Sequence, residues 1–463
     1  MGVGSYLTRW IDGDLLTWFV RVELLVGLLG GWSATLIFLS FGRDGSFRTL
    51  LLLIVGGVGV GVGIEIPLLV RILEGRMALK DLIARVLFFD YLGALAASLL
   101  FPLLLVPRLG LIRSSLLLGI LNALVGLGVI LLLGRSLRRF RRLVAEALAC
   151  VVVLGVGFGY GEALTRLSEE HLFPHDIIHS ESTRFQRIVV TRSRQGETRL
   201  YLSGHLQFSS LDEYRYHEAL VHVPLAAAPK RPLSVLVLGG GDGLAVREVL
   251  RYPEAVVRDV TLVDLDPAMT ALFTSHTELA AMNDGALTNP RVTVVNHDAF
   301  AWVDGTGPRF DVAIVDFPDP SSYAVGKLYT RTFYQRLRRR LADDGVMVVQ
   351  STSPLVARRS FWCIHDTMAD IGLTTLPYHA FVPAFGTWGY VLASPSPLSP
   401  PTHLHVQAPR TLRFLTHAVL PGLFVFPPDM QRPDGEAERP INRLNDQALV
   451  RLYDEEWRAI GGE

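Results

Sequence analysis

Two carboxylates stand three residues apart in Asp316-Phe317-Pro318-Asp319, directly after the apolar run Val312-Ala313-Ile314-Val315. A run of this kind is typical of a buried strand in a parallel sheet, and such sheets bind their ligands at the carboxyl ends of the strands. A pair of carboxylates can hold an ammonium group and can also remove a proton from it. We therefore expect Asp316 and Asp319 to face an amine, whereas the alternative is a solvated turn with Asp before Pro.

A glycine-rich loop, Gly239-Gly240-Gly241-Asp242-Gly243, follows another apolar run. Such a loop turns tightly and brings backbone N–H groups and a helix N-terminus against a nucleotide or its charged substituent. Asp264 ends the next apolar run, where a carboxylate can accept both hydroxyls of a ribose, and His297-Asp298-Ala299 ends the one after, within reach of an adenine amino group. These signals predict a nucleoside cofactor. The Asp242 carboxylate and the lack of a second dinucleotide-binding half favour an adenosyl sulfonium over NAD.

Apolar runs alternate with helical stretches through this part of the chain, which predicts an α/β Rossmann-like domain of the S-adenosylmethionine-dependent methyltransferase type over 233–394. Strands are expected at 235–238, 260–263, 292–295, 312–315 and 346–349. Short β-rich runs separated by turn residues predict a β-hairpin lid unit over 175–232. A Pro-rich linker and a helical tail make up 395–463, with the tail expected against the sheet domain or a second subunit.

The front of the chain has a different composition. Between residues 15 and 164, long apolar stretches approach the roughly 20 residues that a membrane-spanning helix needs. We expect about five such helices within a transmembrane domain over 1–165, at 16–40, 49–70, 86–106, 114–134 and 143–163. A hydrophobic content of 50% and a mean hydropathy of +0.34 fit a membrane part fused to a soluble part.

Composition also excludes some classes of function. Lys plus Arg and Asp plus Glu both number 44, so the chain lacks the basic excess typical of a protein that binds nucleic acid. Its only cysteines are Cys150 and Cys363, which excludes a disulfide scaffold and a Cys-rich metal site. We expect neither nucleic acid nor a metal ion as a partner.

Two acidic residues, Glu65 and Asp90, interrupt the expected membrane helices. A carboxylate inside a membrane costs several kcal/mol unless it is paired or hydrated. One interpretation is structural: the carboxylates pair with Arg71 or Arg85, or extend toward the interface. The other is that they bind a cation. The sequence leaves both open.

Several motifs together resemble the polyamine aminopropyltransferases, or spermidine synthases. They are the string from Arg199 to Phe208, the groups Asp212-Glu213 and Tyr216-His217-Glu218, the loop from Gly239 to Gly243, and the run from Asp316 to Pro320. The resemblance covers about residues 180–394, and ordinary methyltransferases of the same fold lack the hairpin motif and the paired aspartates. The apolar front half is similar to the membrane-fused branch of that family.

This resemblance implies transfer of the 3-aminopropyl group of decarboxylated S-adenosylmethionine to an amine such as putrescine, giving spermidine and methylthioadenosine. The donor would be a co-substrate, with no permanently bound cofactor and no metal. Asp316 would be the base, and Tyr216, His217 and Asp319 would orient the diamine. The residues implied on the donor side are Gln186, Gln207, Gly239, Gly241, Asp242, Asp264, Asp298 and Ala299. Asp264 would hold the ribose, and Asp242 the aminopropyl ammonium.

Three departures from the family pattern lie on the acceptor side: Ser203 replaces the usual Asp, Ser321-Ser322-Tyr323 replaces a Gly-Pro loop, and Phe385 replaces a Tyr. The acceptor amine is therefore left open, as is a homodimer or higher homo-oligomer. One alternative function is an S-adenosylmethionine-dependent methyltransferase acting on a membrane-associated substrate, although its cofactor carboxylate would repel Asp242. The other is a non-catalytic polyamine-binding or transport protein of the membrane.

Two observations disagree about which side of the membrane the soluble half occupies. Arginines crowd the connectors 71–85 and 134–143, so the positive-inside rule places those connectors in the cytoplasm and the soluble half outside, provided that 143–163 spans. The sulfonium donor, however, is made in the cytoplasm and is too polar to cross lipid unaided. We expect a multi-pass cell-membrane protein with a cytoplasmic catalytic domain. The segment 143–163 is the least convincing span because it contains Glu146 and Glu162.

Overall fold

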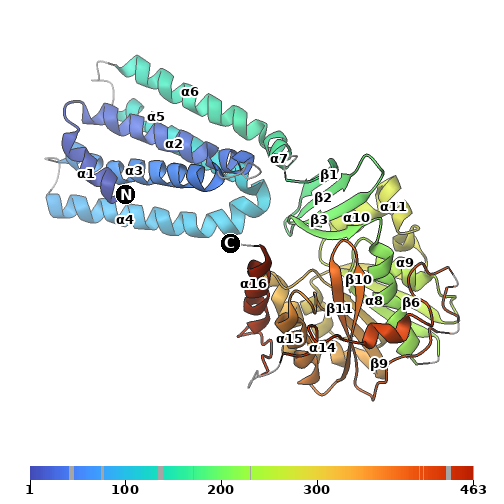
Figure 1. Ribbon diagram of the computed structural model, residues 1–463. Coiled ribbons are helices and arrows are strands. Elements are labelled where there is room, and N and C mark those ends of the chain that lie inside the picture. The colour runs from blue at the N-terminus through green and yellow to red at the C-terminus, as the bar shows by residue number, and fades with distance from the viewer. Residues whose placement is uncertain are drawn as a thin grey trace. The chain divides into compact units, whose positions relative to one another are not determined.

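The computed structural model describes residues 1–40, 46–74, 78–133, 139–169, 172–229, 231–405, 407–409, 411–433 and 439–461. These residues fall into two compact units, Met1–Gly196 and Glu197–Glu463. Figure 1 colours the first unit from blue to green and the second from green to red. The hairpin unit expected at 175–232 has residues in both units, and its boundaries stay a prediction.

The first unit is mostly helical. Its helices are α1 (Gly2–Leu7), α2 (Leu15–Ser40), α3 (Ser46–Leu73), α4 (Leu79–Leu100), α5 (Val106–Leu133), α6 (Phe140–Gly159) and α7 (Gly161–Glu169). Within the described residues, four helical stretches are long and apolar enough to cross a membrane: Leu15–Ser40, Phe47–Leu73, Lys80–Leu133 and Phe140–Gly159. The third contains the two segments expected at 86–106 and 114–134. Gly110 (φ 74°) breaks the regular helical backbone between them.

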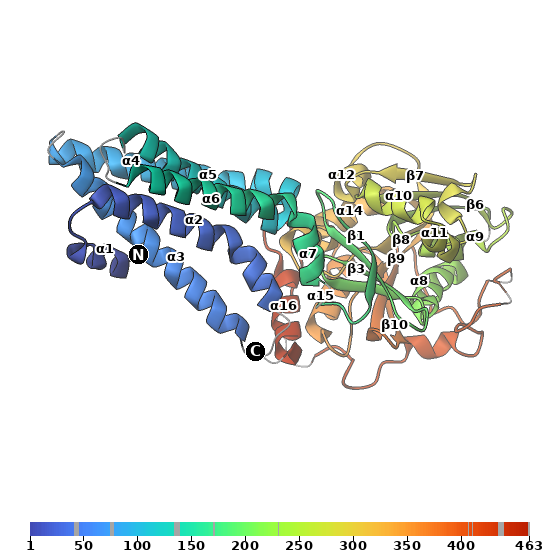
Figure 2. The same cartoon turned by 90° about the horizontal axis from the view of Figure 1, so that it is seen from above.

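Helices α2, α5 and α6 lie side by side and share an apolar core (Figures 1 and 2). Small residues allow the close approach of α2 and α5. A Cβ atom on Gly119 would stand 2.5 Å from the carbonyl oxygen of Gly27 and 2.9 Å from Cα of Gly31. Glycine is therefore required at this crossing, as expected for helices that pack through small residues.

A proline inside α3 explains how α1 is held. Pro67 has no N–H group, so it cannot donate the helical hydrogen bond to the carbonyl oxygen of Gly63, four residues earlier. The hydroxyl of Ser5, in α1, donates to that oxygen instead, at 2.9 Å. The short N-terminal helix thus compensates for a backbone bond that Pro67 removes.

The segment expected at 143–163 is better suited to span than its acidic residues indicate. Glu146 accepts hydrogen bonds from Arg21 of α2, at 3.2 Å, and from Arg142, at 3.0 Å. Glu162 lies beyond α6, in α7, and pairs with Arg187 at 3.3 Å. An ion pair lowers the cost of a charge in lipid. Phe140–Gly159 is one of the four stretches that are long and apolar enough to span, and which of them is the weakest span stays a prediction.

The pairing of Glu65 with Arg71 is not observed. The Arg71 guanidinium donates to the carbonyl oxygens of Thr8 and Ile11, at 2.8 and 2.9 Å, and lies 3.6 Å from Asp12. Oε1 of Glu65 is buried and has no hydrogen-bond partner in the described part of the chain. Arg71 is thus not the partner of Glu65, and cation binding by Glu65 and Asp90 stays a hypothesis.

The first unit ends in an antiparallel pair of strands, β1 (Asp176–Ser182) and β2 (Arg187–Arg192). The second unit opens with another, β3 (Thr198–Leu202) and β4 (His205–Ser209). Ser203 and Gly204, which connect β3 to β4, both have positive φ, at 50° and 89°. Two such residues form the turn whose twist matches a two-residue hairpin.

A seven-stranded mixed sheet forms the centre of the second unit, in the order β10-β11-β9-β8-β5-β6-β7. The strands are β5 (Leu233–Gly239), β6 (Val257–Asp264), β7 (Val292–Asn296), β8 (Phe310–Asp316), β9 (Leu341–Gln350), β10 (Thr374–Val382) and β11 (Gly386–Ser394). The strands from β9 to β7 run parallel, whereas β11 pairs antiparallel with both β9 and β10. All five expected strands are present, as β5 to β9, and β11 was not expected. The sequence missed β10, an edge strand that contains Pro377, because proline argues against a strand.

Helices cover both faces of this sheet. Leu236 and Leu238 of β5 belong to a core shared with four helices, whereas Val235 and Val237 point the other way and are also fully buried. The four helices are α12 (Ala299–Asp304), α14 (Arg331–Arg339), α15 (Arg358–Ala369) and α16 (Ala448–Gly461), the last of which lies beside α15 in Figure 1. Helix α8 (Glu213–Ala227) contacts α9 (Leu244–Leu250) and strands β8 to β11. The remaining helices are α10 (Pro267–Ser275), α11 (Thr277–Met282) and α13 (Tyr323–Gly326).

The strand order reverses between β5 and β8. From β5 the chain continues outward through β6 and β7, and it then returns to β8 on the other side of β5. Gly239, at the end of β5, is the register partner of Asp316, at the end of β8. Open α/β sheets bind ligands beyond the carboxyl ends of their strands at such a switch point. The glycine loop and the paired aspartates therefore meet where a ligand is expected.

Candidate active site

The glycine loop is shaped by its closeness to Asp316. Gly239 and Gly240 have φ values of 80° and 67°, which glycine adopts without steric cost. A Cβ atom on Gly239 would stand 2.2 Å from the carbonyl oxygen of Asp316, and one on Gly240 would stand 3.0 Å from its Oδ2. The loop therefore needs glycine for both its backbone conformation and its contact with the carboxylate.

Asp264 lies on the other side of the same loop. Its Oδ2 accepts a hydrogen bond from the N–H of Gly241 at 3.0 Å, and its Oδ1 accepts one from the N–H of Asp266 at 2.9 Å. Burial raises the pKa of Asp264 to about 6, although these two backbone bonds oppose the shift. A Cβ atom on Gly241 would stand 2.7 Å from its Cγ. The carboxylate is thus fixed beside the loop, where it can face the hydroxyls of a ribose.

Asp242, the one residue of this loop that is not glycine, is buried, with 8% of its surface exposed. Its Oδ1 accepts a hydrogen bond from the N–H of Leu244 at 2.9 Å, at the start of α9. Burial raises the pKa of Asp242 to about 6, aided by the charge of Asp316 and opposed by that of His217. The side chain is therefore an anion above about pH 6, in surroundings that favour a bound cation.

Asp316 meets a tyrosine from α8. The hydroxyl of Tyr216 donates to Oδ1 of Asp316 at 2.6 Å. Burial raises the pKa of Asp316, while the charge of His217 and the Tyr216 hydrogen bond oppose that rise. Burial and the Asp316 charge raise the pKa of Tyr216 well above its ordinary value, so Tyr216 remains the donor. An aspartate with a raised pKa is better suited to accept a proton than an ordinary one.

His217 lies behind this pair, with 3% of its surface exposed. Its Nδ1 lies 2.8 Å from Oε2 of Glu213, which Arg247 also contacts at 3.0 Å. Burial lowers the pKa of His217, but the hydrogen bond and charge of Glu213 and the charges of Asp242 and Asp316 outweigh it, so the net shift is upward. In the contacts that the structure describes, His217 acts on the two aspartates by its charge.

Asp319 has both oxygens engaged. Its Oδ1 accepts a hydrogen bond from the Gln350 side chain at 3.2 Å. Its Oδ2 accepts from the hydroxyls of Thr352, at 3.1 Å, and Tyr453, at 2.9 Å. Burial raises the pKa of Asp319 and these three donors oppose the rise. The two aspartates thus differ in their surroundings. Asp319 accepts hydrogen bonds from three side chains, whereas Asp316 accepts one from Tyr216.

The other residues that the sequence predicts on the donor side are Asp298, Ala299, Gln207 and Gln186. Asp298 accepts from the N–H of Phe300 at 2.8 Å, which caps α12 ahead of Ala299, and from Nζ of Lys327 at 2.7 Å. These donors lower the pKa of Asp298 despite its burial. Gln207 donates to the carbonyl oxygen of its neighbour His205 at 3.1 Å. Gln186 lies in the first unit, between β1 and β2. Cofactor contacts by these residues stay predictions.

Comparison with known proteins gives the family. Residues 213–402 match the model of the spermine/spermidine synthase domain. The polyamine aminopropyltransferase of Leptospira interrogans is 48% identical over 460 residues, which are 99% of this chain and 90% of that protein. Polyamine aminopropyltransferase 2 of Ralstonia nicotianae is 49% identical over 469 residues, again 99% of this chain and 90% of that protein.

The chain belongs to the polyamine aminopropyltransferases. A crystal structure of spermidine synthase in complex with the transition-state analogue AdoDATO is similar to it, with a TM-score of 0.50 and 26% identity over 54% of this chain and 86% of that one. The expected family and the Rossmann-like fold are thus confirmed. The expectation of an enzyme rather than a passive membrane protein is confirmed with them.

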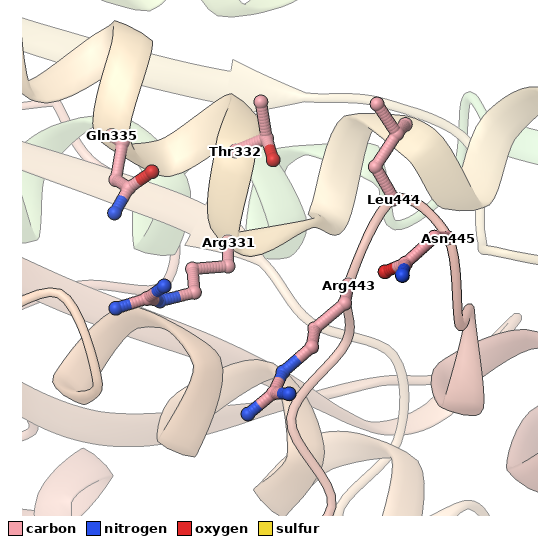
Figure 3. A pocket seen from close by; sticks show the side chains of 6 residues that line it. All are labelled: Arg331, Thr332, Gln335, Arg443, Leu444 and Asn445. Carbon is pink, nitrogen blue, oxygen red and sulfur yellow. The ribbon is translucent and has the colours of Figure 1, made fainter.

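A pocket of about 320 Å³ lies elsewhere on this aminopropyltransferase, between α14 and the segment that precedes α16 (Figure 3). Its lining residues are Arg331, Thr332, Gln335, Arg443, Leu444 and Asn445. None of them is a predicted site residue, so this pocket is separate from the carboxylates at the switch point. Among the described residues, no group of three or more His, Cys, Asp or Glu side chains is arranged to hold a metal ion.

Sequence reasoning missed several residues of this aminopropyltransferase site. Gln350, Thr352 and Tyr453 hold Asp319, and Lys327 holds Asp298. Glu218, part of the motif that carried the resemblance, accepts from the N–H groups of residues 413–415, at 2.7 to 2.9 Å, and so fastens the chain beyond the linker. Gln350 could have been found from the sequence, because it is a polar residue at the carboxyl end of an apolar strand. No sequence pattern indicates Tyr453.

Proposed function

We propose that this aminopropyltransferase transfers the 3-aminopropyl group of decarboxylated S-adenosylmethionine to a diamine such as putrescine, giving spermidine and methylthioadenosine. The observation that carries the proposal is the convergence of Asp242, Asp264 and Asp316 on one glycine loop at the switch point of the sheet. Three carboxylates in one small, partly dry site suit a donor that is a cation and an acceptor that arrives as one.

The reaction is a direct displacement. The acceptor nitrogen forms a bond to the terminal carbon of the aminopropyl chain as the bond from that carbon to sulfur breaks, and the sulfur leaves as the neutral thioether of methylthioadenosine. An ammonium has no lone pair, so the nitrogen must first lose a proton, and Asp316 accepts it. Holding the two reactants beside each other supplies much of the remaining acceleration.

Asp242 provides the preference for the decarboxylated donor. Its anion would bind the ammonium at the end of the aminopropyl chain, whereas intact S-adenosylmethionine carries a carboxylate next to that nitrogen. Two like charges about 4 Å apart repel by roughly 4 kcal/mol at an effective dielectric constant of about 20. This repulsion disfavours the methyltransferase alternative.

On the acceptor side, Asp319 would bind the diamine's second ammonium, and Tyr216 would orient Asp316. His217 supports Asp242 and Asp316 by its charge. Gln207, Asp298 and Ala299 would complete the nucleoside side of the donor site.

We also propose that the apolar helices of the first unit lie in the cell membrane and that the catalytic unit faces the cytoplasm. Length and composition of the four helical stretches support the first part. The cytoplasmic supply of the sulfonium donor supports the second.

The test is one incubation series with the purified full-length protein. Decarboxylated and intact S-adenosylmethionine are each supplied with a panel of diamines, and the products are identified by mass spectrometry. The expected products are methylthioadenosine and a diamine lengthened by one aminopropyl group, from the decarboxylated donor alone. Methylated products from the intact cofactor would instead support the methyltransferase alternative, and no turnover with any pair would contradict the proposal.

A further inference from the structure

The C-terminal helix α16 lies beyond the residues that match the family domain, 213–402, and yet it reaches one of the two paired aspartates. The hydroxyl of Tyr453, in this helix, donates to Oδ2 of Asp319 at 2.9 Å, across 134 positions of the chain. Both residues belong to the same compact unit. A segment that the family domain does not include thus contributes a polar group to the candidate acceptor site.

Helix α16 is firmly packed on the sheet domain. Leu449 and Leu452 are buried in the core that covers one face of the sheet. The carboxylate of Glu456 accepts hydrogen bonds from the N–H groups of Arg359, at 2.6 Å, and Ser360, at 3.0 Å, at the start of α15. Backbone donors at the start of a helix otherwise lack partners, so Glu456 acts as a cap supplied from another helix. These contacts hold α16 in one position.

The Tyr453 hydroxyl completes a set of three donors around Asp319. The other two come from the end of β9 and the loop that follows it, namely the side chains of Gln350 and Thr352. Thr352 has a positive φ of 56°, an uncommon conformation for a residue with a branched Cβ. All three donors are neutral, so they fix the orientation of the carboxylate without cancelling its charge. Asp319 therefore keeps its attraction for an ammonium group and loses its freedom to turn.

Phe385 provides a second reason to assign a role to Tyr453. Its ring lies 6.4 Å from that of Tyr216 and 5.1 Å from that of Trp388, measured between centroids, so it stands on the acceptor side of the site. A phenylalanine offers no hydroxyl there. The phenol that reaches Asp319 comes from the C-terminal helix instead.

We infer that Tyr453 is a positioning residue for the acceptor amine, and that α16 completes the acceptor side of the active site by fixing Asp319. The inference rests on the proposed function, since it assigns Asp319 to the amine rather than to the donor. Loss of the Tyr453 hydroxyl should therefore weaken binding of the diamine and leave binding of the donor unaffected. Among the contacts described, the donor-side carboxylates Asp242 and Asp264 make none with α16.

The experiment is Tyr453→Phe in the full-length enzyme, since this change removes only the hydroxyl and leaves the ring beside Trp457. A hydrogen bond to a charged group is worth about 1.5–3 kcal/mol, so we expect the KM for putrescine to rise by roughly tenfold or more. The KM for decarboxylated S-adenosylmethionine should stay within twofold, and kcat within about threefold. Calorimetry of putrescine binding to enzyme saturated with methylthioadenosine should show the same loss of affinity as KM.

Tyr334→Phe is the matched control. Tyr334 is a fully buried tyrosine of α14 in the same core, and its hydroxyl has no hydrogen-bond partner in the described part of the chain. That variant should bind putrescine as the wild type does. A double-mutant comparison adds a second readout: in an Asp319→Asn background, Tyr453→Phe should have little further effect on putrescine affinity.

The outcomes are distinct. Unchanged putrescine affinity in Tyr453→Phe, in an enzyme that is otherwise active, would overturn the inference alone. A parallel loss for putrescine and for the donor, with a lowered melting temperature, would reduce Tyr453 to a packing residue and also overturn it. A wild-type protein that transfers no aminopropyl group would overturn the proposed function, and the inference with it.

Discussion

The Tyr216 hydroxyl donates a 2.6 Å hydrogen bond to Oδ1 of Asp316, although the two residues are 100 positions apart in the chain. One oxygen of the carboxylate is thereby directed toward α8, and the other, Oδ2, lies against Gly240. Tyr216 keeps its proton because its pKa lies well above the ordinary value. We propose Asp316 as the base for the attacking amine, and its hydrogen bond with Tyr216 is the basis of the first two predictions.

Asp316→Asn should lower turnover by at least about a hundredfold, because an amide cannot accept the proton and a general base contributes roughly 10²–10⁴ in rate. The affinity for methylthioadenosine, measured by calorimetry, should change little. Asp304→Asn, a substitution of the same kind in a half-exposed ion pair with Arg336, serves as the control. Turnover of Asp316→Asn within a few-fold of the wild type would remove Asp316 as the base.

Tyr216→Phe should shift the acid side of the pH profile of kcat/KM upward. The Tyr216 hydrogen bond lowers the pKa of Asp316, so its removal raises that pKa and leaves less of the ionised base at a given pH. We therefore expect the acid limb of the profile to lie at higher pH in the variant than in the wild type, because a hydrogen bond to the carboxylate stabilises its ionised form. A profile that falls in height without moving along the pH axis would show that Tyr216 acts elsewhere.

Asp242→Asn should reduce the preference for the decarboxylated donor. The anion at this position repels the carboxylate of intact S-adenosylmethionine and attracts the ammonium, and the amide does neither. In the wild type, the same preference should weaken as the pH falls below about 6, where Asp242 becomes protonated. Calorimetric titration with both cofactors between pH 5 and 8 measures it. Equal discrimination by wild type and variant would exclude Asp242 as its source.

Asp242→Asn should also stabilise the ligand-free protein near pH 8. The pKa of Asp242 is about 6 when folded and about 3.9 when unfolded, so the folded state favours the protonated form, and ionisation above pH 6 costs about 2–3 kcal/mol. Wild-type stability from this group therefore falls as the pH rises from about 4 to 6, and the variant should show no such fall. Thermal melting in detergent at pH 4 and pH 8 compares the two, and a variant that melts lower at pH 8 would contradict the prediction.

Labelling should place the catalytic unit in the cytoplasm. Gln195, exposed beside the turn after β2, is replaced by Cys, and the native Cys150 and Cys363 are both buried, so the parent protein is the background control. A membrane-impermeant maleimide should react with the variant only after the cells are opened. Labelling in intact cells would place this side of the protein outside and would weaken the assignment of the donor.

The sequence by itself predicted which residues stand at the strand ends of the candidate site. Gly239 to Gly243, Asp264 and Asp316 each follow an apolar run, and parallel strands bring their carboxyl ends to one edge of a sheet whatever their separation in the chain. Local patterns were enough because the backbone of the sheet does the positioning. The same reasoning found the five parallel strands and missed the antiparallel pair β10 and β11.

Only the tertiary structure shows which distant side chains hold Asp319 and Glu146. Tyr453 meets Asp319, and Arg21 meets Glu146, because separate helices pack so that one side chain reaches the other. No short-range pattern records such a contact, since it depends on where whole helices dock and not on the period of a strand or helix. A hydrogen bond between distant side chains becomes visible only when the core that holds both elements is known.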